Sequence, residues 1–355
     1  MKYVFKIIDA VCFNETFYLG VIMMRNTHFR VGIAVLLLQF LLPGFAVAQN
    51  DTNGLVIFGD SLSDTGNKYA ITGFANTPPY SELLEFFLVA DGPYTRGGLH
   101  HSNGATWIEQ YARPLGQAGY VRPALRSQSK ARNYAYGGAR ARPGTPIIPN
   151  NNQHLPTQVT NFFADVNNAA PSDALYMIFI GGNDIFDAVF ALSLDDTGAL
   201  STRVLDEAVT SVVVEIAKLK LAGATHFVVL NAPDLGLTPA VAIADAVFSS
   251  TNPNIDPGDV KDAATLFSFL YNTGLSTALG ADPDIQIIDI FTAFQQLVLN
   301  PQDFGLTNSV DACVTPDLPP YACKKSNGYV FWDGVHPTKV THGIIADVVS
   351  EALTQ

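Results

Sequence analysis

Five short apolar segments, each followed by glycine or polar turn residues, constrain the fold of this chain more than any other feature. They cover residues 55–58, 131–136, 174–180, 226–230 and 285–290. Two of the stretches between them, 201–221 and 263–279, carry apolar residues at helical spacing. Short, nearly continuous apolar strands that alternate with helices are typical of a parallel sheet covered on both faces. The sequence therefore predicts an α/β protein with these five segments as its strands.

The composition supports a globular protein and argues against nucleic-acid binding. Of 355 residues, 48% are hydrophobic and 15% are charged, which suits a chain with a substantial core. Acidic side chains outnumber basic ones by 32 to 20, giving a net charge of −12, and Lys and Arg form no basic stripe. We expect no nucleic-acid partner.

The first 48 residues have the layout of an export signal. Arg25 and Arg30 flank a polar start, residues 31–42 are nearly all apolar, and Ala46-Val47-Ala48 has the small-x-small pattern of a cleavage site. The alternative is an uncleaved membrane anchor, because the apolar run approaches spanning length. We expect residues 1–48 to be a leader, translation to start at Met23 or Met24, and residues 49–355 to form a single catalytic domain that is secreted or periplasmic.

Two cysteines remain after the leader, and we expect them to form a disulfide. Cys313 and Cys323 lie ten residues apart in a proline-containing loop. In an exported protein such a pair most simply forms one bridge. No second cysteine pair or nearby histidine cluster completes a tetrahedral metal site, so we expect no metal at these residues.

The polar residues that follow the first three strands are expected to converge. Ser61 follows the first strand, Gly138 the second and Asn183 the third. In open parallel sheets, ligands bind outside the carboxyl ends of the strands. The sequence thus predicts one site built from three separate segments.

A serine near the start and a histidine near the end have the chemistry of a nucleophile and its base. An alcohol is a weak nucleophile at neutral pH and needs both a base and stabilisation of the oxyanion. Asp333 precedes His336 by three residues, a spacing that lets the carboxylate hold one ring nitrogen. We predict Ser61 as nucleophile, His336 as base and Asp333 as the acid that orients it. Structural alternatives are an N-cap role for Ser61 and a turn role for Asp333.

Four further histidines of the expected domain are not assigned a catalytic role. His226 opens a predicted buried strand, and His342 is expected on the surface of the terminal helix. His100 and His101 lie in a glycine-rich loop and could line a pocket, but the sequence shows no partner that would orient them.

Three groups are candidates for the oxyanion donors. They are the backbone N–H groups of Ser61 and Gly138 and the side-chain amide of Asn183. Structural alternatives are a glycine turn at residues 137–138 and an Asn-Asp turn at residues 183–184.

These segments together resemble the GDSL-type members of the SGNH hydrolase family, which are esterases and lipases. The four family blocks read FGDSLSDTGN at 58–67, NYAYGGA at 133–139, GGND at 181–184 and DGVHP at 333–337. The resemblance implies Ser61 as nucleophile, Gly138 and Asn183 as oxyanion donors, His336 as base and Asp333 as its partner. Gly138 is preferred to Gly137 because it is the fifth residue after Asn133.

The resemblance also implies the architecture and the general activity. It implies a three-layer α/β/α sandwich with a flavodoxin-like, five-stranded parallel sheet. Within the family the chain looks most like the exported bacterial branch of lipases, phospholipases and haemolysin-like acyltransferases, a placement that NAPDLGLTP at 231–239 supports.

The leading hypothesis is an exported carboxylic-ester hydrolase that works through an acyl-enzyme. Carbohydrate acetylesterase or phospholipase/acyltransferase activity at the same site, and a non-catalytic binding domain, are the alternatives. We expect a small-molecule or lipid ester as substrate, with transient contact to a lipid or polysaccharide surface. Neither a metal nor an organic cofactor is expected, and the sequence leaves the oligomeric state open.

Overall fold

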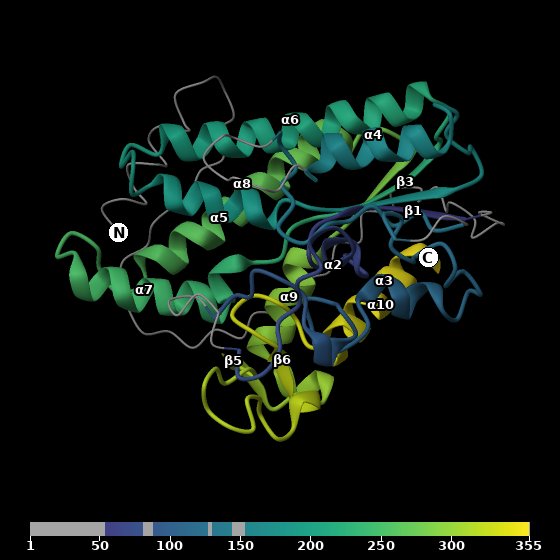
Figure 1. The fold of residues 1–355 in the computed structure, drawn as a ribbon. Helices are drawn as coiled ribbons and strands as arrows, with labels where there is room; N and C mark the ends of the chain where they lie inside the picture. The colour runs from purple at the N-terminus through teal and green to yellow at the C-terminus, as the bar shows by residue number, and fades with distance from the viewer. Residues whose placement is uncertain (1–53, 81–87, 127–129, 144–152, 355) are drawn as a thin grey trace, which may run out of the picture.

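The computed structural model describes residues 54–80, 88–126, 130–143 and 153–354 (Figure 1). The predicted leader at 1–48 lies outside the described residues. None of the helices in the described ranges combines the length and the apolarity needed to cross a membrane.

Four parallel strands form the central sheet, in the order β1-β2-β3-β4. They are β1 (Leu55–Gly59), β2 (Leu175–Phe179), β3 (His226–Leu230) and β4 (Ile285–Ile288). β4 ends two residues earlier than the predicted 285–290, because the Asp289 side chain accepts a hydrogen bond from the Thr292 N–H and caps the next helix.

The second predicted strand, 131–136, lies beside β1 as an irregular extended segment. Ile57 N–H donates to the Arg132 carbonyl at 2.9 Å, Tyr134 N–H donates to the Ile57 carbonyl at 2.8 Å, and the pairing is parallel. Its regularity is broken at Asn133, whose buried side-chain amide donates to the Ser63 carbonyl at 2.8 Å. The segment thus completes the 2-1-3-4-5 order of flavodoxin-like sheets, although it forms isolated bridges and no regular strand.

Helices cover both faces of the sheet, and side-chain alternation along each strand builds two cores. On β1, Val56 and Phe58 pack on one side with helices α4, α5, α6 and α8, whereas Leu55 and Ile57 pack on the other with α3 and α10. Figure 1 shows α4, α5, α6 and α8 on one side of the sheet and α3, α9 and α10 on the other. The predicted three-layer α/β/α sandwich is confirmed.

The predicted helices 201–221 and 263–279 are confirmed within α6 and α8. The α-helices of the described residues are α2 (Asn67–Thr72), α3 (Trp107–Ala112), α4 (Leu155–Asp165), α5 (Gly182–Ala191), α6 (Ala199–Leu221), α7 (Pro239–Thr251), α8 (Asp259–Leu279), α9 (Ile290–Leu299) and α10 (Lys339–Thr354).

A second, two-stranded parallel sheet lies near the C-terminal end of the chain. It consists of β5 (Asn308–Ala312) and β6 (Tyr329–Phe331). Cys313 follows β5 and forms a disulfide with Cys323, with the sulfurs 2.03 Å apart. Asp333 and His336 lie in the turn that follows β6.

Candidate active site

Ser61 is presented by a tight turn at the end of β1. The N–H groups of Ser63 and Asp64 both donate to the Asp60 carbonyl, and Leu62 N–H donates to Asp60 Oδ1 at 3.0 Å. The turn leaves Ser61 and Leu62 partly exposed between the buried Asp60 and Ser63. Gly59 is required before it, because a Cβ at this position would lie 2.5 Å from the Phe179 carbonyl oxygen of β2.

Ser61, His336 and Asp333 form one hydrogen-bonded chain. His336 Nε2 lies 2.8 Å from Ser61 Oγ, and His336 Nδ1 lies 2.8 Å from Asp333 Oδ2. The three-residue spacing lets Asp333 fold back onto His336, and Asp333 Oδ1 also accepts a hydrogen bond from the backbone N–H of His336 at 2.8 Å. This pairing fixes a proton on Nδ1 and leaves Nε2 free to accept the proton of the serine.

Tyr94 belongs to the same hydrogen-bonded chain, although no local sequence pattern links it to Asp333. Its hydroxyl donates to Asp333 Oδ2 at 2.7 Å, so one carboxylate oxygen serves both Tyr94 and His336. The Tyr94 ring is fully buried and packs edge-on against Trp332 at a centroid distance of 5.7 Å. Burial and the Asp333 carboxylate raise the pKa of Tyr94 well above its usual value, which keeps the hydroxyl protonated as a donor.

His101 lies against the base, with the two imidazole centroids 5.0 Å apart. Neither of its ring nitrogens has a hydrogen-bond partner among the described residues. Burial, followed by the charge of His336, holds the pKa of His101 well below its usual value, so its ring is neutral. Gly137 packs against this ring, and a Cβ there would collide with it.

The two glycines at 137–138 have different environments, and these favour Gly138 as the oxyanion donor. Gly137 N–H is occupied, since it donates to Asp64 Oδ2 at 2.9 Å. Gly138 is partly exposed, has a φ of +82°, and its N–H donates to no described residue. The left-handed φ and the free N–H explain why glycine suits this position.

Asn183 reaches the Gly138 segment from the first turn of α5. Its Nδ2 donates to the Ala139 carbonyl at 2.8 Å, which uses one of the two amide hydrogens and leaves the second available. The structure therefore brings Gly138 and Asn183 to adjoining segments, beside the N-terminus of a helix, where a developing negative charge is favoured.

Burial makes several carboxyl groups around these segments less acidic than usual. It raises the pKa of Asp60 to about 6, a shift that the Leu62 N–H and the charge of His336 partly offset. Burial likewise raises the pKa of Asp184, next to Asn183, to about 7, against the opposing effects of the Ala141 N–H and Arg142. Desolvation, which disfavours the charged form, is the dominant cause in both cases.

The expectation that His342 lies on the surface is wrong. The residue is 1% exposed, and its Nδ1 accepts a 3.3 Å hydrogen bond from the Trp107 backbone N–H of α3. His342 lies on the face of α10 that packs on α3. The sequence of α10 alone does not show which of its polar residues lie on this buried face. His226 begins β3, as predicted, and is partly exposed.

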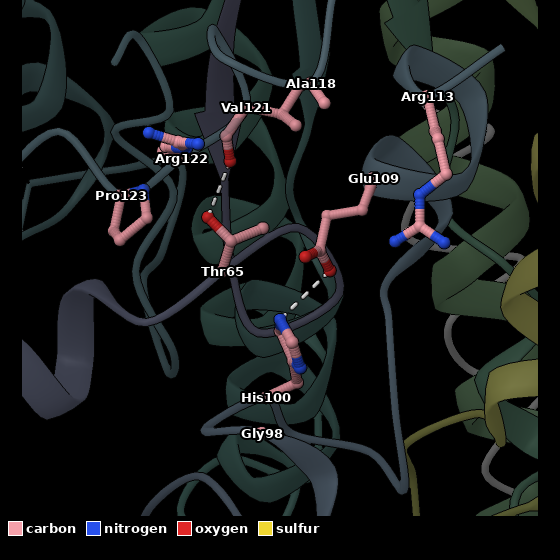
Figure 2. Close-up of a pocket in the computed structure, with 9 residues that line it drawn as sticks. All are labelled: Thr65, Gly98, His100, Glu109, Arg113, Ala118, Val121, Arg122 and Pro123. Atoms are coloured by element: carbon pink, nitrogen blue, oxygen red, sulfur yellow. Dashed lines mark hydrogen bonds and ion pairs between the residues drawn. The ribbon is translucent and has the colours of Figure 1, made fainter. Parts of the chain in front are cut away.

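His100 lines a cavity of about 240 Å³ that is separate from Ser61 (Figure 2). Its ring is held on both sides: Nε2 lies 2.9 Å from the Glu109 carboxylate and Nδ1 lies 2.6 Å from the Gly97 carbonyl. The lining residues are Thr65, Gly98, His100, Glu109, Arg113, Ala118, Val121, Arg122 and Pro123. None of the predicted catalytic or oxyanion residues is among them. The described residues also contain no group of three or more His, Cys, Asp or Glu side chains that could hold a metal ion.

A parallel α/β/α sandwich with a Ser–His–Asp chain at the carboxyl ends of its strands defines an α/β serine hydrolase. The chain belongs to the family of GDSL-like lipases and acylhydrolases, whose pattern it matches over residues 55–349. The confirmed family and the site make it a carboxylic-ester hydrolase.

Relatives come from both plants and bacteria. GDSL esterase/lipase 5 of Arabidopsis thaliana is 25% identical, over 85% of this chain and 83% of its own length. The phosphatidylcholine-sterol acyltransferase of Aeromonas hydrophila is 23% identical, over 82% of this chain and 88% of its own. Among solved structures, an acetylxylan esterase from Geobacillus stearothermophilus is 16% identical and covers 85% of this chain and 94% of its own, with a TM-score of 0.43. A similarity at this level carries no argument about substrate.

Proposed function

We propose that the protein is an exported esterase or lipase that cleaves carboxylic esters through an acyl-enzyme on Ser61. The observation that carries the proposal is the continuous chain from Ser61 Oγ through both nitrogens of His336 to Asp333, with both links 2.8 Å long. In serine hydrolases this arrangement activates the hydroxyl as it attacks, and it stabilises the imidazolium that forms.

In the first half-reaction, Ser61 Oγ attacks the ester carbonyl carbon while its proton moves to His336 Nε2. The carbonyl oxygen becomes an oxyanion, which the N–H groups of Ser61 and Gly138 and the Asn183 amide stabilise. The tetrahedral intermediate then collapses, the C–O bond to the alcohol breaks, and His336 returns the proton to the leaving alkoxide. The products are a free alcohol and an ester of Ser61.

In the second half-reaction, His336 takes a proton from water as its oxygen attacks the carbonyl carbon of the Ser61 ester. The second tetrahedral intermediate collapses, the bond to Ser61 Oγ breaks, and His336 returns the proton to Ser61 Oγ as the acid is released. An alcohol that replaces this water would give acyl transfer in place of hydrolysis, and the acyltransferase relative from Aeromonas hydrophila supports this alternative. Acetylated carbohydrate is a further candidate substrate. Comparison of rates on triglyceride, phospholipid and acetylated xylan distinguishes the three.

We also propose that residues 1–48 direct export and that residues 49–355 act as one catalytic domain. Two observations support export: the signal-like pattern of the leader and the Cys313–Cys323 disulfide, which is stable in an oxidising compartment. N-terminal sequencing of protein recovered outside the cytoplasm tests this, with residue 49 expected as the first residue.

The catalytic proposal predicts that Ser61→Ala abolishes esterase activity without unfolding the protein. Ser61 is partly exposed, so removal of its hydroxyl costs little packing. We expect kcat on a short-chain p-nitrophenyl ester to fall by about 10⁴-fold or more. Ser250→Ala is the matched control, because Ser250 lies at the exposed end of α7 and bonds only to the local Val247 carbonyl among the described residues. Ser61→Ala with wild-type activity would overturn the assignment of Ser61 as nucleophile, whereas a wild-type protein without esterase activity would leave the non-catalytic binding domain as the better interpretation.

A further inference from the structure

The two predicted oxyanion donors other than Ser61 lie on different segments, and one side chain connects them. Arg140 Nη1 donates to the Gly138 carbonyl at 3.1 Å. The other edge of the same guanidinium binds Asp187, with Nε 2.5 Å from Oδ2 and Nη2 2.8 Å from Oδ1. A bidentate pair of this kind fixes direction as well as distance.

Asp187 lies on α5, four residues after Asn183. Residues four apart in a helix share one face. The Arg140 guanidinium therefore joins the Gly138 carbonyl to the turn of α5 that follows Asn183. Because a helix turn is rigid, a displacement of Asp187 is passed on to Asn183.

Contacts on both sides of the Gly138 N–H fix its orientation. This N–H belongs to the peptide between Gly137 and Gly138. On one side, Gly137 N–H is held by Asp64 at 2.9 Å; on the other, the Gly138 carbonyl is held by Arg140 at 3.1 Å. The intervening peptide is left with one free N–H whose direction is set by its neighbours.

A second set of bonds connects the same two segments and is consistent with this role. Ala141 N–H donates to Asp184 Oδ2 at 2.8 Å, and Arg142 binds Asp187 through Nη2. Arg142 Nε also lies 3.2 Å from Asp184 Oδ1, an ion pair without hydrogen-bond geometry. The side chains of Arg140 and Asp187 are 13% and 21% exposed, so solvent screens their interaction less than it does at a free surface.

We propose that Arg140 and Asp187 form a clamp that positions the Gly138 N–H and the Asn183 amide relative to each other for oxyanion stabilisation. Both are positioning residues, since they act through Gly138 and Asn183 and not on the substrate. The inference rests on the proposed function. Oxyanion donors contribute only at their correct distance, so the clamp affects the transition state far more than substrate binding.

The first test compares Arg140→Gln and Arg140→Lys with the wild type. We expect kcat to fall by about 10- to 100-fold in both, because a misplacement near 1 Å can cost about 10²-fold, while KM changes by less than about threefold. Lys retains the charge but lacks the fork, so wild-type activity in Arg140→Lys would overturn the clamp. Arg203→Gln is the control, since Arg203 is exposed on α6 and lies 3.8 Å from Glu207. The acid limb of the pH–rate profile should stay in place in every variant, because the Ser61–His336–Asp333 chain is unchanged.

A double-mutant cycle with Asn183→Ala separates positioning from a general structural effect. If Arg140 acts by placing the donors, Arg140→Gln costs clearly less in the Asn183→Ala background than in the wild type. Equal costs in both backgrounds would overturn the proposal. Should Arg140→Gln not fold, Asp187→Asn replaces it in the cycle with the same expectations. Failure of the clamp is distinct from failure of the proposed function, because the latter requires an active Ser61→Ala variant.

Discussion

At the scale of single residues, Asp333 is a fully enclosed group of the site. It is 0% exposed, and its two oxygens accept four hydrogen bonds. Two come from the backbone N–H groups of Val335 and His336, one from the His336 ring and one from the Tyr94 hydroxyl. The local pair was predictable from the Asp-x-x-His spacing, whereas Tyr94 reaches Asp333 across 239 residues of sequence, and no local pattern encodes that.

We predict that Tyr94→Phe shifts the pH dependence of catalysis. Loss of the hydroxyl removes a donor that withdraws charge from Asp333 Oδ2, so the carboxylate stabilises the protonated His336 more strongly. The acid limb of kcat/KM should therefore move to higher pH by roughly half to one pH unit. The measurement is kcat/KM on a soluble ester from pH 5 to 9.

Tyr176→Phe is the matched control, because it also removes one buried tyrosine hydrogen bond, to the Pro171 carbonyl at 2.8 Å, away from the site. A Tyr94→Phe profile that superimposes on that of Tyr176→Phe would show that the hydroxyl does not act on the triad.

At the scale of elements, α3 packs against α10, the helix that follows His336 in the chain. α3 begins with a capping box formed by Thr106 and Glu109, and Glu109 also binds His100 at 2.9 Å. The Trp107 N–H, one of the unpaired donors at the start of α3, is satisfied by His342 of α10. A buried histidine thus acts as a tertiary helix cap.

His342 should make the fold sensitive to acid. Burial, with the charges of His100 and His336, lowers its pKa from 6.5 to about 3. Between pH 6.5 and pH 3 the unfolded chain binds a proton at His342, whereas the folded chain does not. The stability that neutral His342 contributes is therefore complete above pH 6.5 and is lost as the pH falls towards 3. Each pH unit in that window costs about 1.4 kcal/mol in the free energy of unfolding.

The test is urea unfolding of wild type and His342→Gln between pH 7 and pH 4.5. The free energy of unfolding of the wild type should fall more steeply with decreasing pH than that of the variant, and the difference in slope should correspond to about one bound proton. The plots of unfolding free energy against pH for the two proteins should therefore converge as the pH is lowered. Parallel curves would contradict the assignment of the proton to His342. The variant is expected to be the less stable of the two at pH 7, because the Trp107 N–H loses its partner.

At the scale of the whole molecule, the sequence was sufficient for the layers and for the location of the strand segments along the chain. Apolar runs such as 174–180 mark buried strands without any knowledge of tertiary contacts. The irregular pairing of 131–136 was not predictable, because it depends on the buried Asn133 amide and its bond to the Ser63 carbonyl, which join distant segments. The surface assignment of His342 failed for the same reason, since its partner lies on α3.

The same distinction holds for the site. Ser61, Asn183 and His336 stand in recognisable local patterns at strand ends or in a turn. His101 and Arg140 act through contacts that form only when separate segments meet, such as the Arg140–Asp187 pair. Residues that support a catalytic group are therefore harder to predict than the group itself.

Covalent labelling tests the central claim most directly. The full chain is treated with a fluorophosphonate, digested, and analysed by peptide mass spectrometry, with His336→Ala as a parallel sample. The account predicts one adduct, on Ser61, and labelling in the His336→Ala variant that is slower by at least about 10³-fold, because the serine then lacks its base. An adduct on a different residue, or an unlabelled Ser61 in protein that still hydrolyses esters, would contradict it.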